Sequence, residues 1–313
     1  MRPLVIALAL VTVVVGLALM IERRSQRADA SETGLDAVVA ADAAVAVVAP
    51  PVAEVPTVVV ATVRGPVERW HDGVWRPVVD GESLDANDHV RTGDGGEATL
   101  AIASVGTVVL APRSDFEVGR RTQELMSLQL GRGGLHAEVT QSGGLPLRIA
   151  IRGTDTIAES RGGDFSILTE GQGAVAVAVA RGSVDVTAAA TTVRVDAGAL
   201  SVVAPGRAPS SPRAIPPSLI LKLGRAPRAV TSREITVSGR TTPGAIVRLM
   251  AAGETAVTAG PDGRFTARIA LVEGRNQVLV EALDPIGRTA RDQLPVIVDT
   301  RPPDVEAEVR WSP

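Results

Sequence analysis

Cysteine is absent from this 313-residue chain. Without thiols the protein forms no disulfide, holds no metal through thiolates and has no cysteine nucleophile. Proteins without cysteine are stable in both oxidising and reducing compartments, so this absence does not locate the protein. Its location has to be inferred from the N-terminal sequence.

Aromatic residues are scarce as well, at 2% of the chain, with no tyrosine, three phenylalanines and three tryptophans. Proteins that bind single-stranded nucleic acid stack the bases on aromatic side chains and present a basic surface. This chain has few such side chains, and its formal net charge is -3. We therefore expect no nucleic-acid partner.

Histidine is rare, and no common catalytic or metal-binding motif is present. His71, His89 and His136 lie far apart and outside any HExxH-type spacing, although the fold could still bring two of them together. The sequences GDGG (93–96) and GRGG (131–134) lack the Lys-Ser/Thr pair that completes a phosphate-binding loop, so they indicate backbone bends. A GxSxG nucleophile motif is also missing. We expect no enzymatic activity and no cofactor.

Short runs of small and β-branched residues dominate the rest of the chain. Hydrophobic residues make up 45% of it, which is enough for real cores. Between Val90 and Val118, residues 99–104 alternate with the period of a β-strand, and Gly106 separates them from a second run at 107–110. From residue 57 onwards turn signals recur too closely for crossover helices. The sequence therefore predicts an all-β body.

An apolar run from Pro3 to Ile21 precedes that body. At about 1.5 Å per residue a helix over this run would be roughly 28 Å long, close to the thickness of a bilayer core. We predict a transmembrane anchor at residues 1–21, with 3–21 in the membrane. A cleaved signal peptide is the alternative, because Ala28-Asp29-Ala30 has the small-x-small form, but the run is longer than is usual for one.

The charges around this predicted anchor bear on its orientation. Arg23, Arg24 and Arg27 follow it, whereas only Arg2 and the amino terminus precede it. Positive charge prefers the cytoplasmic side, so this count alone places the body in the cytoplasm. We nevertheless predict a single-pass inner-membrane protein with its folded domains in the periplasm, because the rest of the chain is typical of an extracytoplasmic protein.

Residues 22–56 form an Ala/Val/Pro-rich segment of low complexity. Residues 35–49 have the alanine content of a helix, and the prolines after them favour an extended chain. A tether between membrane and body is the simplest role. Packing along a partner's helix is the alternative, although Asp36 and Asp42 do not define a clean polar face.

A family resemblance covers residues 57–204. The segments that carry it occur in a characteristic order: VRGPV (63–67), WRPV (75–78), VRTG (90–93), GTVVL (106–110), LQLGRGGL (128–135), GDF (163–165), ARGSV (180–184) and VDAG (195–198). This order resembles the FecR domain, a bacterial envelope module. The resemblance implies a solenoid-like stack of short strands, in which glycines serve the corners.

The resemblance also bears on partners. FecR-type regulators of iron-transport genes carry a cytoplasmic region ahead of the membrane helix, and that region contacts a sigma factor. In this sequence only Met1 and Arg2 precede the predicted helix. We therefore expect no sigma-factor contact through this chain.

A second domain is predicted after a Pro-rich linker at 205–217. Alternating runs in 218–304 fit a β-sandwich, with turns at 261–263 and 274–276. The segments TVSGRTTPGAIVRL, PDGRF and LVEGRNQVLVEALDPIGR resemble bacterial immunoglobulin-like repeats. Residues 305–313 would be a short tail, or the beginning of a further repeat.

Two weak sets of candidate binding residues complete the prediction. Asp284, Asp299 and Asp304 lie near the expected end of the sandwich and could supply oxygen ligands to Ca²⁺, although no EF-hand spacing is present. Trp70 and Trp75 flank the first hairpin and could form a stacking surface for a carbohydrate or a protein partner, or could simply be packed.

The sequence thus favours a non-enzymatic, membrane-tethered envelope protein that binds or scaffolds an envelope protein or a cell-wall polymer. The alternative is a FecR-type transmembrane signalling regulator that acts through another membrane chain.

Overall fold

The structure, a computed structural model, describes residues 56–140, 145–171 and 173–301. Within these ranges every regular element is a β-strand, which confirms the predicted all-β class. The described part of the chain contains no helix with the length and apolarity needed to cross a membrane. The predicted anchor, nearly all of the predicted tether and the predicted tail lie outside the described residues.

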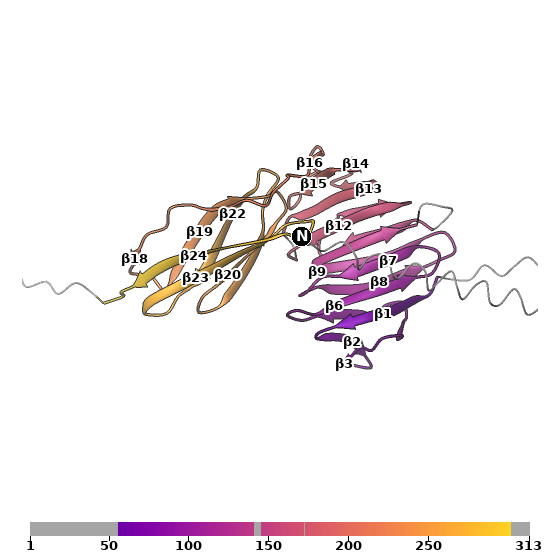
Figure 1. Ribbon diagram of the computed structural model, residues 1–313, viewed down its shortest axis with the longest axis horizontal. Helices are drawn as coiled ribbons and strands as arrows, with labels where there is room; N and C mark the ends of the chain where they lie inside the picture. The colour runs from indigo at the N-terminus through magenta and orange to yellow at the C-terminus, as the bar shows by residue number, and fades with distance from the viewer. Residues whose placement is uncertain (1–55, 141–144, 172, 302–313) are drawn as a thin grey trace, which may run out of the picture. The chain divides into compact units, whose positions relative to one another are not determined.

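The first sixteen strands belong to one hydrogen-bonded network (Figure 1). They are β1 (Val58–Arg64), β2 (Val67–His71), β3 (Val74–Pro77), β4 (Ser83–Leu84), β5 (His89–Thr92), β6 (Glu97–Ile102), β7 (Gly106–Leu110), β8 (Asp115–Arg121), β9 (Met126–Val139), β10 (Leu147–Ile151), β11 (Ile157–Ser160), β12 (Gly163–Thr169), β13 (Val175–Ala188), β14 (Thr191–Asp196), β15 (Ala199–Val203) and β16 (Arg213–Ala214).

Two long strands fold this network into a first and a second sheet. The N-terminal half of β9 pairs with β8 and β10 in the second sheet, and its C-terminal half pairs with β7 and β12 in the first. β13 likewise pairs with β12 and β15 in the first sheet and with β11 and β14 in the second. Gly133 and Gly182 stand at these two changes of sheet, with φ of +89° and +74°. The predicted bend at 131–134 is therefore a corner inside a strand.

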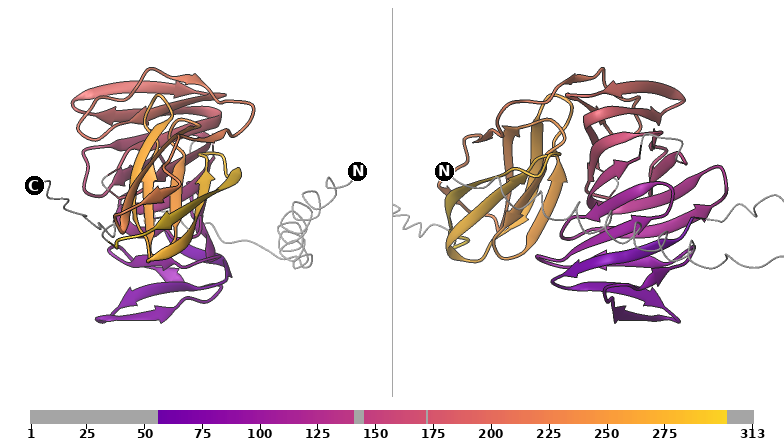
Figure 2. Two further views of the ribbon diagram at one scale, coloured as in Figure 1. Left: turned by 90° about the vertical axis from the view of Figure 1, so that its left-hand side faces the viewer. Right: turned by 45° about the vertical axis from the view of Figure 1, so that its right-hand side comes forward.

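The side chains between the two sheets form the main hydrophobic core. In β6 the buried residues Ala98, Leu100 and Ile102 alternate with partly exposed ones, as the sequence period predicts. The largest fully buried side chains include Phe116 and Phe165, one from each sheet. The strands of this network lie one above another in both turned views (Figure 2), and most of them contribute buried residues to this core.

The predicted turns are only partly where the sequence places them. Asp72 and Gly73 both have positive φ, 51° and 80°, which gives the two-residue turn that a right-twisted hairpin prefers. Gly106, by contrast, is the first residue of β7 and not the turn itself. The glycines at 93–96 are followed by β6 and not by a helix, in agreement with a bend and not a phosphate loop.

The remaining eight strands form two further sheets, of three and five strands. They are β17 (Leu221–Leu223), β18 (Ala229–Val230), β19 (Glu234–Thr241), β20 (Ile246–Met250), β21 (Glu254–Thr258), β22 (Arg264–Ala270), β23 (Gly274–Leu283) and β24 (Thr289–Val298). Buried residues of both sheets, such as Phe265 and Val280, share one core. The turn predicted at 261–263 is present, with φ of +78° at Gly263, whereas Gly274 already begins β23.

A third, smaller cluster joins residues of β12, β13 and β15 to Ile246 of β20. The segment predicted as a linker contributes β16, which pairs with β15. All described residues belong to one compact unit. Experiments on the folded body therefore use residues 53–313 together.

Candidate binding surface

Trp70 and Trp75 meet across the β2–β3 hairpin, at one end of the second sheet. The backbone N–H of Val78 donates to the carbonyl of Val67 at 3.0 Å, so the ladder's alternation makes Trp70 and Trp75 a non-hydrogen-bonded pair. Side chains approach most closely in such pairs. Their ring centroids lie 5.4 Å apart, with the planes tilted by 59°. The Asp-Gly turn thus brings both predicted residues together.

Arg91 of β5 holds this pair from the side. Its guanidinium lies over the ring of Trp75, 4.0 Å from the centroid, which is a cation–π contact. It also donates to a carboxylate oxygen of Glu68 at 2.7 Å. Trp70 keeps 41% of its surface exposed. Arg91 therefore restrains the indole of Trp75, whereas the indole of Trp70 is exposed to solvent.

The same face continues in two parallel rows across neighbouring strands. The first row runs Trp75, Trp70, His89 and Glu117, and the second runs Pro77, Glu68, Arg91 and Asp115. Strand spacing puts neighbours in a row about 4.8 Å apart. We call the Trp75–Trp70–His89 row, together with Glu68 and Arg91, the ring row. It combines three aromatic rings with one hydrogen-bond acceptor, Glu68, and one hydrogen-bond donor, Arg91.

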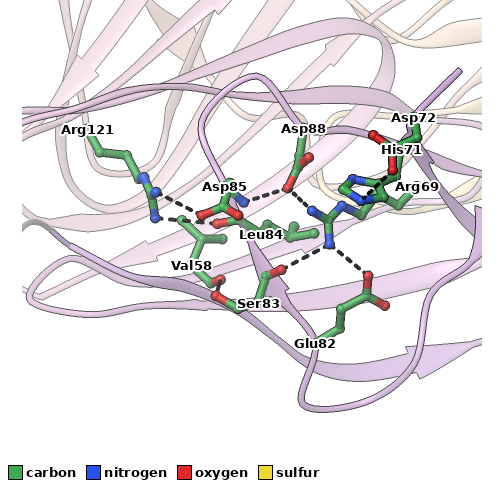
Figure 3. Close-up of polar contacts among 10 residues, drawn as sticks. All are labelled: Val58, Arg69, His71, Asp72, Glu82, Ser83, Leu84, Asp85, Asp88 and Arg121. Carbon is green, nitrogen blue, oxygen red and sulfur yellow. Dashed lines mark hydrogen bonds and ion pairs between the residues drawn. The ribbon is translucent and has the colours of Figure 1, made fainter.

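Arg69 lies on the opposite side of β2 from the ring row, the side on which Val67 is also buried. Figure 3 shows its polar contacts. It donates to Glu82 at 2.9 Å and to the carbonyl of Ser83 at 3.2 Å, and it pairs with Asp88 at 2.7 Å. Burial alone would lower the pKa of Arg69, but the hydrogen bond to Glu82 and the charge of Asp88 outweigh it and leave the pKa raised. Arg69 is thus a permanent cation that fixes the segment carrying β4.

A second arginine extends this network towards β8. Arg121 pairs with Asp85 at 3.3 Å and donates to the carbonyl of Leu84 at 3.4 Å (Figure 3). The backbone N–H of Asp85 in turn donates to Asp88 at 2.5 Å. The polar network in Figure 3 therefore supports β2 from behind and limits how far the tryptophans can shift. No sequence motif predicts it, because Glu82, Asp85 and Asp88 lie in loops that only the fold places beside the two arginines.

The three aspartates predicted as Ca²⁺ ligands lie differently. Asp284 is 1% exposed, accepts from the backbone of Arg288 at 2.8 Å and pairs with that residue's guanidinium at 2.6 Å. Asp299 pairs with Arg301 at 3.0 Å. Asp284 and Asp299 precede and follow β24, whose length puts them about 30 Å apart, so they do not share one site. Asp304 is outside the described residues, among which no group of three metal-binding side chains occurs.

One further cluster has side chains of catalytic type. On the first sheet, His136 contacts the hydroxyl of Ser166 through Nδ1 at 3.0 Å and Asp164 through Nε2 at 3.2 Å. β9 and β12, which carry these residues, are each paired on both sides, so their backbone N–H groups are engaged in the ladders. Oxyanion stabilisation needs free donors beside the nucleophile. The cluster lacks such donors and gives no support to a hydrolase.

Three solved structures show a distant likeness to this chain. Two crystal structures of a "putative anti-sigma factor" from Parabacteroides distasonis ATCC 8503 are 16% and 15% identical, each with a TM-score of 0.36, covering 40% of this chain. The chain spans 59% of the length of that protein. A Ca²⁺-stabilised adhesin of an Antarctic bacterium, which binds ice, is 14% identical, with a TM-score of 0.21, and the match covers 79% of this chain and 66% of the adhesin.

Comparison with protein families is more informative. No curated protein matches the chain. A family model described as FecR protein matches residues 88–185. This range contains Arg91 and most strands of both sheets, whereas the two tryptophans precede it. The FecR resemblance noted in the sequence is confirmed over residues 88–185, and the chain contains a FecR domain there.

Proposed function

We propose that this protein is a non-enzymatic, membrane-tethered protein of the bacterial cell envelope, and that the ring row binds an envelope partner. The observation that carries the proposal is Trp70, which is 41% exposed and packs against Trp75. Large aromatic side chains and arginine are enriched where proteins bind partners. A rigid surface also loses less conformational entropy on binding.

The location in this proposal rests on the sequence and the family. Residues 3–21 anchor the chain in the inner membrane, 22–56 are the tether, and the folded body lies in the periplasm. The body's C-terminal sandwich is immunoglobulin-like and acts as a second module. A periplasm-active reporter fused after Pro313 tests this topology: activity is expected, and activity only from a cytoplasm-active reporter would contradict it.

The binding role is tested by retention of envelope components on immobilised residues 53–313. Trp70→Ala removes the exposed indole, and Val272→Ala is the matched control, because Val272 is a 55% exposed apolar residue of the sandwich. We expect a component that the wild type and Val272→Ala retain and Trp70→Ala loses. Equal retention by all three forms would contradict the proposal.

The FecR match at residues 88–185 favours one further candidate function, a signalling regulator that acts through another membrane chain. Deletion of the gene followed by transcript profiling separates the two functions. A regulator changes the transcription of a defined operon, whereas a binding or scaffolding protein changes envelope integrity without such a response.

A further inference from the structure

The chemistry of the ring row narrows the class of partner, an inference that rests on the proposed function. We infer that the ring row binds a linear sugar chain of the cell wall. The order of the rings, the pairing of the charges beside them and the free edge of β3 all favour this ligand.

The rings form a track. The ring centroids of Trp75 and Trp70 lie 5.4 Å apart, and His89 stands on the next strand, at a strand spacing of about 4.8 Å. Either step is similar to the length of one sugar ring. The C–H face of a sugar packs against an aromatic face, and indole provides the largest such face in proteins. Trp70 is exposed for this contact, and Arg91 already covers part of Trp75. Successive sugars would therefore lie across the strands, with one centred on Trp70.

The charges beside the rings are balanced. Glu68 and Arg91 pair at 2.7 Å, and Glu117, beyond His89 at the end of its row, pairs with Arg152 at 3.1 Å. The ring row therefore attracts no strongly charged ligand. The Glu68 carboxylate accepts hydrogen bonds and the Arg91 guanidinium donates them, and both keep exposed surface, 38% and 47% of their side chains. Sugar hydroxyl groups do both, so they match this pair.

The edge of β3 disfavours a peptide added as an extra strand. In the described residues β3 pairs only with β2. Trp75 and Pro77 stand at the non-hydrogen-bonded positions, where backbone groups point away from β2. Proline has no N–H to donate there, so an added strand would lose part of its ladder. Binding through side chains on the face is thus favoured over binding through the strand edge.

Cosedimentation of residues 53–313 with protease-treated, protein-free cell-wall sacculi tests the inference. We expect saturable binding by the wild type. The affinity of Trp70→Ala should be lower by a factor of about ten or more, the loss typical of a central tryptophan contact. Glu68→Gln should weaken binding and Trp70→Phe should keep part of it. Val272→Ala should bind like the wild type. Thermal unfolding checks that each variant is folded.

Two results would overturn the inference. One is wild-type binding that is absent or does not saturate, and the other is equal binding by wild type and Trp70→Ala. If residues 53–313 do not bind sacculi but retain an envelope protein in a Trp70-dependent manner, the partner is a protein. The inference is then wrong and the proposed binding role holds. If neither ligand is retained, the proposed function fails with the inference.

Discussion

Arg69 is a charged residue in a position that faces the interior. The side chains of Arg69 and Asp88 are only 12% and 11% exposed, so their pairing replaces much of the water that each group has lost. Such a pair adds little stability over an apolar substitute, but removal of one member leaves the other charge buried. At the end of a stack of strands, an inward charge also discourages a further strand from adding to the core.

Arg69→Met tests this role, because it keeps a long side chain and removes the charge. Asp88 and Glu82 are then left without their cation, and we expect about 2 kcal/mol lower stability, less than a fully buried pair would lose. Urea unfolding measures it. Arg64→Met is the control, since Arg64 is 78% exposed in its pair with Glu97 and should change stability by about 0.5 kcal/mol or less. Equal effects of the two substitutions would contradict the role given to Arg69.

A second prediction at this scale concerns the turn between β13 and β14. Ala189 and Ala190 have φ of 46° and 56°, a left-handed conformation that disfavours alanine. Ala190→Gly should therefore raise the unfolding free energy, by about 0.5 to 1 kcal/mol after the greater flexibility of glycine in the unfolded chain is counted. A rise in the urea midpoint is expected, and a fall would show that this turn is not strained.

The corners at which β9 and β13 change sheets are the elements that define the fold. A Cβ at Gly182 would lie 2.4 Å from the carbonyl oxygen of Gly162, whereas a Cβ at Gly198, with a similar φ of +78°, would meet nothing within 4 Å. Both positions disfavour alanine, but only the first also clashes with backbone. Alanine substitutions at the two glycines therefore separate the cost of the left-handed backbone conformation, which both share, from the cost of the steric clash, which only Gly182 has.

Gly182→Ala should therefore lower stability by more than 3 kcal/mol, and Gly198→Ala by only about 1 to 2 kcal/mol. Thermal unfolding of the two variants beside the wild type gives the comparison. Similar losses would mean that the corner is not tightly packed.

The elements also show how far the sequence predicts this structure. Alternation predicts β6 and β7, and Asp72-Gly73 predicts the β2–β3 hairpin, because both signals are local. The long strands are not predicted, since the glycines at 131–134 indicate a bend but carry no signal that one strand, β9, continues through it. The Ala-Ala turn has no sequence signal at all, because it depends on the strands that it joins.

The candidate site is also predicted only in part, because only its local features have a signal in the sequence. Trp70 and Trp75 are found from their rarity and from the hairpin between them. Arg91 and Glu68 are not, since only the register of β2 with β5 places them beside the rings. The Arg69 network likewise depends on contacts between segments far apart in the sequence.

At the scale of the whole molecule, arginine–carboxylate pairs recur over the surface and make stability depend on pH. Hydrogen bonds from Arg113 to Asp94 and from Arg301 to Asp299 lower the pKa of both carboxyl groups, and a hydrogen bond from the backbone of Thr300 lowers that of Glu273. A lowered pKa in the folded state stabilises the protein above the unfolded pKa, near 4, and this stabilisation is lost as pH falls.

The urea midpoint should therefore stay level from pH 7 to about pH 5 and decline below about pH 4. Titration of the midpoint with pH measures it. Stability that rises on acidification through this window would contradict the stabilising role of these carboxylates.

The central claim for the whole molecule is that one end of the second sheet meets a partner in the cell. An aromatic photo-crosslinking residue at position 70 of the full chain, which keeps a ring there, tests this most directly. Position 194, on β14 near the other end of that sheet and 64% exposed, is the control. We predict a light-dependent adduct from position 70 that is absent from position 194. No adduct at position 70, or the same adduct from both positions, would contradict the claim.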